Sequence, residues 1–284
     1  MPILTIARLT ILESARRRLL LILIVLTLIT IALTGWGFTK LVDAGASSGQ
    51  PLTTSELRIV TSQILIMVGF MFSGVIALTA IMAASLSVAG DIESGVMLAL
   101  LPRPIRRVDF LLGKWLGLGF VLAIYTSATV AIELAVAQWT TGFVTPHPFL
   151  LAAYLIGEGL VLLTLGLLLS TRFSGIAGGI SAVILFLMTW MGGIAGGIGI
   201  ALHNDAIAQV GTVSRLILPS DGLWRGAVYS LEPPIVLAQH LGRIAAGNPF
   251  YAPDPPSAAY IGWVLIWLLA VMALAAVSLR MREV

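Results

Sequence analysis

Residues 175–201 read GIAGGISAVILFLMTWMGGIAGGIGIA, an unbroken run without a charged side chain. An α-helix rises about 1.5 Å per residue, so about 20 apolar residues cross the roughly 30 Å hydrocarbon core of a bilayer. No water is present there, and backbone polar groups must bond within the protein. The run therefore predicts a membrane-spanning helix, which its length and glycines allow to tilt, kink or extend past the membrane.

Five further segments meet the same requirement. They are Leu19–Gly37, Ile64–Val88, Leu112–Ala137, Phe149–Ser170 and Tyr260–Leu279. Hydrophobic residues make up 58% of the 284 and charged residues only 10%, whereas a soluble domain carries about 25% charge. So little charge cannot cover a water-facing surface. The sequence predicts an all-α integral membrane protein, with six transmembrane helices in a single domain over residues 1–284.

Lysine and arginine predict the orientation, because they are enriched on the cytoplasmic side of membrane proteins. Of the 16 basic residues, those before the first span, between the second and third, between the fourth and fifth, and after the sixth all face one side. They are Arg8, Arg16, Arg17, Arg18, Arg103, Arg106, Arg107, Lys114, Arg172, Arg280 and Arg282. Both termini are therefore predicted to be cytoplasmic. The basic residues sit beside apolar runs instead of forming a broad patch, so no nucleic-acid partner is expected.

Two segments outside the spans have apolar periodicity. Residues 2–17, within segment 1–18, predict an amphipathic helix along the cytoplasmic interface, with its cations near anionic lipid headgroups. The alternative is a positively charged anchor that happens to be helical. The external loop 202–259 predicts short helices that dip into or lie on the outer interface, with Trp224 and Tyr229 as interfacial aromatics. The alternative is an ordinary folded cap.

The cytoplasmic stretch 89–114 reads AGDIESGVMLALLPRPIRRVDFLLGK. Two acidic residues precede a short apolar run, Val96–Leu101, and acidic groups favour a helix N-terminus. Prolines end that run, and arginines follow them. The pattern predicts a short stiff helix parallel to the membrane, which forms a docking surface for a cytoplasmic partner or, alternatively, rests on lipid. The residues assigned to coupling are Asp91, Glu93, Gly95, Pro102, Arg103, Pro104, Arg106 and Arg107.

The order of these features resembles the ABC-2-type permease family, which includes the permease of the copper-enzyme maturation system. The motifs that carry the resemblance are Asp91-Ile-Glu93-Ser-Gly95, Leu100-Leu-Pro102-Arg-Pro104-Ile-Arg106-Arg, Gly113-Lys114 and Ser-Asp221-Gly-Leu-Trp224-Arg225. In that family the cytoplasmic loop forms the coupling helix against the ATPase. Val96 departs from the family pattern, which often has threonine after the glycine.

The resemblance implies the permease subunit of an ABC exporter in the plasma membrane of a bacterium or archaeon. A separate ABC ATPase would bind ATP and Mg, and a second permease would pair with this one as a homodimer or heterodimer. No cofactor is expected on this chain, whose sequence lacks G-x-x-x-x-G-K-[ST]. The alternative is an ATP-independent secondary transporter or channel, although no internal repeat is evident. A membrane enzyme is disfavoured and no catalytic residue is assigned, because the one Gly-x-Ser-x-Gly match, residues 45–49, lies in a small-residue loop.

Polar and small residues inside the spans are candidates for a substrate pathway or for packing. Glu158 lies deep in the fourth span, where a carboxylate is costly and marks either a pathway or a hydrogen-bonded structural group. Glu133 lies about four residues from the outer end of the third span and is expected to reach the interface, and the alternative is a functional carboxylate that faces a partner or a watery cavity. Small residues four apart allow close helix packing, within one subunit or against a second permease. These residues are Gly192, Gly193, Gly196 and Gly197. The three histidines lack metal-site spacing, and no metal site is predicted.

The basic residues predict which positions face the outside of the cell. Cysteines introduced at Ser47 and Ser257 should react with a membrane-impermeant maleimide on intact cells, and a cysteine at Ser94 should not. Labelling of Ser94 from outside would reverse the orientation.

Overall fold

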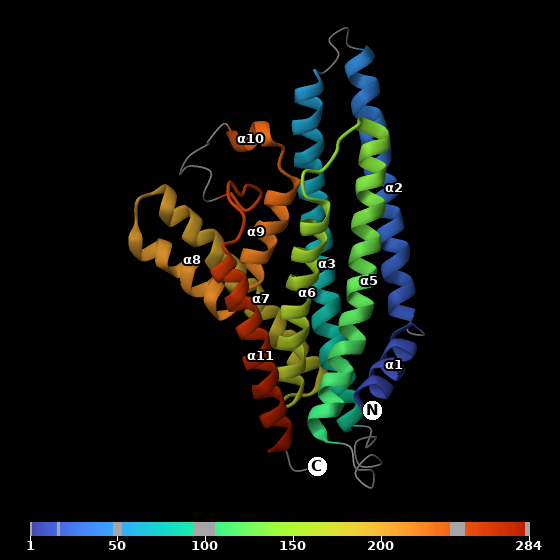
Figure 1. Ribbon diagram of the computed structural model, residues 1–284, viewed down its shortest axis with the longest axis vertical. Helices are drawn as coiled ribbons and strands as arrows, with labels where there is room; N and C mark the ends of the chain where they lie inside the picture. Colours follow the sequence, from blue (N-terminus) through green and yellow to red (C-terminus); the bar gives the residue numbers. More distant parts are fainter. Residues whose placement is uncertain (1, 16–17, 48–52, 94–105, 239–247, 282–284) are drawn as a thin grey trace.

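The computed structural model describes residues 2–15, 18–47, 53–93, 106–238 and 248–281, which are nearly all helical and contain no strand (Figure 1). Six of the described helices are long and apolar enough to cross a membrane. They are α2 (Arg18–Ser47), α3 (Thr54–Glu93), α5 (Arg107–Thr141), α6 (Pro148–Ser170), α7 (Gly175–Ala201) and α11 (Ala258–Arg280). The all-α fold and the six predicted spans are confirmed.

Three of these helices, α2, α3 and α5, are much longer than the spans predicted from hydropathy. The 40 residues of α3 and the 35 of α5 extend about 60 Å and 52 Å at 1.5 Å per residue, against the roughly 30 Å of hydrocarbon. Hydropathy detects only the part of a helix that lies in lipid, whereas the backbone continues into the polar ends. The helix α1 begins, and α11 ends, at the same end of the bundle (Figure 1). We term it the terminal end.

Helix α6 is the centre of the bundle. It packs against α3, α5, α7, α9 (Ser220–Leu231) and α11, and it is the most enclosed of the six spans. Its glycines allow the close packing, since a Cβ at Gly166 would lie 2.9 Å from the carbonyl oxygen of Ile81 in α3. A larger residue would push the two helices apart.

Helix α1 (Pro2–Ala15) packs across the start of α5. Gly113 and Gly117 leave room for α1. A Cβ added at Gly113 would lie 2.6 Å from Ile6, and one added at Gly117 would lie 2.7 Å from Thr10. The opposite face of α1 exposes leucines, among them Leu4 at 62%. Of the helix predicted for residues 2–17, the described residues 2–15 are helical, with one face on α5 and an apolar face uncovered. Its position at a membrane interface stays a prediction.

The segment after α7 folds back along it. Helix α8 (Asp205–Ile217) packs closely against α7. Residues later in α7 contact residues earlier in α8. Added Cβ atoms on the α7 glycines would collide with α8 at three pairs, which are Gly192 with Ser214, Gly196 with Gly211, and Gly199 with Ala208. The two helices are therefore antiparallel, and α8 runs beside the second half of a membrane span.

Helix α11 supplies hydrogen-bond donors to the backbone where α8 ends and α9 begins. The last carbonyls of a helix have no partner within that helix, and irregular backbone at membrane depth must be buried in protein or line a cavity. Three aromatic side chains on one face of α11 donate hydrogen bonds to the last two carbonyls of α8 and to one carbonyl of the turn. The pairs are Tyr260 with Pro219 (3.0 Å), Trp263 with Leu216 (3.1 Å) and Trp267 with Ile217 (2.7 Å).

The expectation that Trp224 is an interfacial aromatic is wrong. Its side chain is 2% exposed, it donates to the Pro249 carbonyl at 3.0 Å, and its ring contacts Phe70 edge to face. Helix α9 packs against α6, so the residues on its apolar face become core. Tyr229 is partly buried and stacks on His147 with ring centroids 5.9 Å apart.

The contact between α7 and α8 predicts a sharp effect of a single methyl group. Gly196→Ala would place its Cβ against the Gly211 backbone, and overpacking of this kind costs about 1–3 kcal/mol. We expect a lower midpoint of thermal unfolding in detergent. Gly262→Ala is the matched control, because no atom lies within 4 Å of an added Cβ there. Equal midpoints for the two variants would contradict the close packing.

Candidate functional site

A buried lysine joins three helices at the terminal end. The ammonium group of Lys114, on α5, lies 2.8 Å from a carboxylate oxygen of Asp91 on α3 and 3.4 Å from one of Glu13 on α1. The lysine side chain is only 6% exposed. A buried charge is stable only when it is paired, and loss of one partner is costly. These three residues, the Lys114 junction, therefore hold α1, α3 and α5 together.

The junction lies where the predicted coupling segment leaves the bundle. Asp91 is partly buried in its ion pair, whereas Glu93 and Arg106 are exposed at the adjoining ends of α3 and α5. These two exposed charges are available to a partner protein, but no contact in the structure tests that role. The other coupling residues Gly95, Pro102, Arg103 and Pro104, and the helix predicted over 96–101, lie outside the described residues.

Arg107, also assigned to coupling, is engaged within the fold. Its guanidinium donates to the carbonyls of Leu279 (2.7 Å) and Arg280 (3.3 Å), the last residues of α11. Arg172 donates to the Ser278 hydroxyl at 2.8 Å. A cation at a helix C-terminus satisfies orphan carbonyls and complements the helix dipole. Both arginines therefore fix the end of α11.

Glu158 lies in the middle of the bundle and is 2% exposed. The hydroxyl of Ser73, on α3, lies 2.9 Å from each of its carboxyl oxygens. The structure thus provides the hydrogen-bonded structural setting that was one of the two sequence hypotheses. A role in a substrate pathway stays a prediction.

Sequence reasoning did not identify a second buried ionic group. Asp221, in the first turn of α9, accepts hydrogen bonds from Arg215 of α8 (2.7 Å) and Arg225 of α9 (3.3 Å), and its side chain is 1% exposed. We term these three residues the Asp221 cluster. The available signal was three charged residues within a short, otherwise apolar segment. The four-residue spacing of Asp221 and Arg225 allows their pairing on one helix, but the pairing with Arg215 was not readable, because α8 and α9 meet only in the folded chain.

The glycines of α7 make room for this cluster and for α8. A Cβ at Gly193 would collide with the Asp221 carboxylate, and Gly192 and Gly196 face Ser214 and Gly211. Gly197 is buried as well. Three of the four glycines named as packing candidates therefore pack within one subunit. A contact of this helix with a second permease stays a prediction.

The sequence model of the family described as ABC-2 family transporter protein matches residues 4–284, nearly the whole chain. The chain belongs to the ABC-2 transporter family. No curated protein matches the chain. The ABC-2 assignment makes this protein an integral membrane permease of an ABC transporter, and six helices of its described residues are long and apolar enough to span the membrane.

The expectation that Glu133 of this ABC-2 protein reaches the interface is wrong. Its residue is 6% exposed, because α5 continues to Thr141 and α6 packs beside it. The carboxyl group lines a small cavity of about 30 Å³ together with Thr126 and Thr129. Within the described ranges, no three histidine, cysteine or carboxylate residues are grouped as metal ligands would be.

One carboxyl group of the ABC-2 protein outside the spans titrates near neutral pH. Glu232, at the end of α9, is fully buried, and burial raises its pKa from 4.5 to about 7, opposed by a hydrogen bond from the Ala252 amide. A raised pKa of an acid means that the folded state binds the proton more tightly. Protonated Glu232 therefore contributes to the stability of the fold. The contribution is complete below pH 4.5 and is lost as the pH rises to about 7.

The Asp221 cluster predicts a large loss of stability when its anion is removed. Asp221→Asn leaves two partly buried guanidinium groups without a counter-charge, and breaking such a buried pair costs about 3–5 kcal/mol. We expect a strongly lowered thermal midpoint and poor recovery from membranes. Asp254→Asn, the same change at an exposed loop residue, should have no effect. An unchanged midpoint for Asp221→Asn would show that the cluster does not stabilise the fold.

Proposed function

We propose that this permease is the membrane subunit of an ABC exporter, and that its terminal end receives the motion of a separate ATPase subunit. The observation that carries the proposal is the Lys114 junction. It ties α1 and α5 to the end of α3, next to the predicted coupling segment. A force on that segment would therefore move three helices together.

Helix α3 provides a route from the terminal end into the bundle. It carries Asp91 of the junction and Ser73, the partner of Glu158, and these residues are about 27 Å apart along a continuous helix. A shift of α3 relative to α6 would change the Ser73–Glu158 contact. This supports the proposal that ATP-driven closure of the ATPase reaches the substrate path through α3.

The same proposal assigns the remaining components of the transporter. ATP and Mg would bind the partner ATPase, since this chain's sequence contains no phosphate-binding loop. A second permease, identical or related, would complete the path. Both termini and the coupling segment would face the cytoplasm, as the lysine and arginine bias predicts. The Ser220–Arg225 motif, which contains Asp221, supports placement in the branch related to copper-enzyme maturation.

The test reverses one exposed charge beside the coupling segment. Glu93→Arg should weaken association with the ATPase about tenfold or more, because close interfacial charge pairs couple by about 1.5–7 kcal/mol, whereas exposed pairs contribute about 1 kcal/mol or less. The measurements are pull-down of the ATPase and ATP hydrolysis in proteoliposomes. Hydrolysis stimulated by substrate should fall with association.

The matched control is Asp254→Arg, an equal charge reversal in the exposed loop before α11. Glu56 is a poorer control, because its carboxylate accepts hydrogen bonds from Thr53 at the start of α3. Full association and hydrolysis in Glu93→Arg would remove this region from the coupling role. Transport by the purified chain without any ATPase would favour a secondary transporter.

A further inference from the structure

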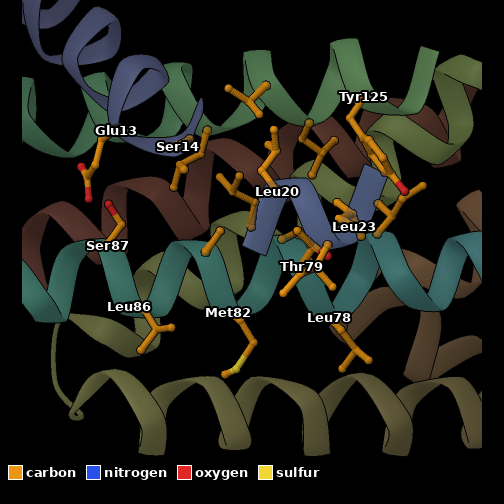
Figure 2. A pocket seen from close by; sticks show the side chains of 18 of the residues that line it. Glu13, Ser14, Leu20, Leu23, Leu78, Thr79, Met82, Leu86, Ser87 and Tyr125 are labelled. Carbon is orange, nitrogen blue, oxygen red and sulfur yellow. The ribbon is translucent and has the colours of Figure 1, made fainter. Parts of the chain in front are cut away.

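Helix α5 lines two cavities of different character. Tyr125 faces a pocket of about 450 Å³ between α2, α3 and α5, which is lined mainly by aliphatic side chains (Figure 2). The next residue, Thr126, lines the cavity of about 30 Å³ that also contains Thr129 and Glu133. The other walls of this smaller cavity come from α3, α6 and α9, and they are apolar. It therefore encloses a carboxyl group and two hydroxyl groups among apolar side chains.

The polar residues of the cavity lie on one face of α5. Thr126, Thr129 and Glu133 follow one another at i, i+3 and i+7, which is the spacing of a single helix face. Thr126 is fully buried and Glu133 is 6% exposed. Their backbones are separated by about 10 Å along the helix axis, but helical side chains lean toward the N-terminus. The Glu133 side chain therefore extends toward the two threonines and shortens this gap.

The polar atoms of this face lack partners. Among the described residues, neither carboxyl oxygen of Glu133 and no group near the Thr126 hydroxyl completes a hydrogen bond. The hydroxyl of Thr34, on α2, lies near the carboxyl group, but it donates its proton to the Thr30 carbonyl at 2.9 Å. It can therefore only accept a further bond. Buried polar groups without partners are costly, because they have lost their bonds to water.

The cavity offers what a buried water molecule needs. A water requires about 10–15 Å³ of such space and two to four polar partners. The volume of about 30 Å³ has room for one or two molecules. The two carboxyl oxygens of Glu133 and the Thr126 hydroxyl supply three partners. Bound water at this place would satisfy all three atoms and would bridge the gap along α5.

The surroundings of Glu133 do not balance a negative charge. Apart from Glu133, the described residues that line the cavity are uncharged. The buried ionisable groups on the adjoining helices have partners elsewhere, which are Lys114 with Asp91, Glu158 with Ser73, Asp221 with Arg225, and Glu232 with the Ala252 amide. The charged residues late in α2 and early in α3 are exposed, and they are Lys40, Asp43, Glu56 and Arg58. A carboxylate buried without a counter-charge takes up a proton and becomes neutral.

We propose that this cavity is a proton-binding site, in which Glu133 is a neutral carboxylic acid joined to Thr126 by one or two bound water molecules. The carboxylate takes its proton from hydronium and leaves water. The acid then donates to bound water or to the Thr34 hydroxyl, and the Thr126 hydroxyl donates to the water. Loss of the proton would place an unpaired charge between α3, α5, α6 and α9, so the packing of these helices depends on it. This site does not depend on the transport role proposed above.

The experiment is infrared difference spectroscopy of the purified full chain in detergent at neutral pH. A protonated carboxyl group has a C=O stretching band that a carboxylate lacks. Glu133→Gln replaces the acid by a neutral amide of the same shape, so we expect loss of one such band relative to the unchanged protein. Thr126→Val removes the hydroxyl and should shift this band to higher wavenumber, because a hydrogen bond through water lowers the C=O frequency.

The matched control for the second variant is Thr140→Val. Thr140 is a partly buried threonine of α5 outside the cavity, and it donates to the Val136 carbonyl. This change should leave the band where it is. Identical spectra for Glu133→Gln and the unchanged protein would overturn the proposal, because Glu133 would then be ionised. An unmoved band in Thr126→Val would overturn it as well. The Thr126→Val spectrum decides the matter even if Glu133→Gln fails to fold, since it keeps the acid in place.

Discussion

Inside the hydrocarbon core, every backbone N–H and C=O must find its partner within the protein, and the architecture of this permease follows from that constraint. Six spans satisfy it by forming continuous helices. The last carbonyls of α8 and the Pro219 carbonyl before α9 cannot do so, since they have no partner within a helix. Tyr260, Trp263 and Trp267 of α11 supply the missing donors, so the last span completes a structure that begins more than 40 residues earlier in the chain.

The free-energy cost of burying a polar group without a partner also determines where the charged side chains lie. Lys114, Asp221 and Glu158 are each nearly fully enclosed, and each contacts an oppositely charged or hydroxyl group on another helix. Such contacts are demanding in geometry, because a shifted helix would leave a charge without its partner. They therefore fix how the helices are positioned against one another, whereas apolar contacts alone would tolerate small slides. Small residues have the complementary role and bring helix backbones together, as Gly113 does for α1.

The two ionic groups hold different parts of the molecule together. The Lys114 junction gathers α1, α3 and α5 near the exposed Glu93 and Arg106. The Asp221 cluster holds α8 and α9 together beside α7. Helix α3 connects the first part to Glu158 through Ser73. This layout supports the proposal that the terminal end receives the motion of an ATPase and that the interior responds to it.

The sequence by itself determined the elements that depend on local composition. A span is a continuous apolar stretch, so all six were readable from hydropathy, and α1 from its periodicity. The tertiary structure decided what depends on contacts between distant segments. That α8 runs back along α7 follows from Gly196 facing Gly211, and burial of Trp224 and Glu133 follows from packing against other helices. Glu133 was misplaced because hydropathy ends a span at the lipid boundary while the helix continues to Thr141. Lys114 was recognised only as part of a motif, since its carboxylate partners lie 23 residues before it in α3 and about a hundred before it in α1. Hydropathy and periodicity report how a segment meets its solvent, and only the folded chain shows which segments meet one another.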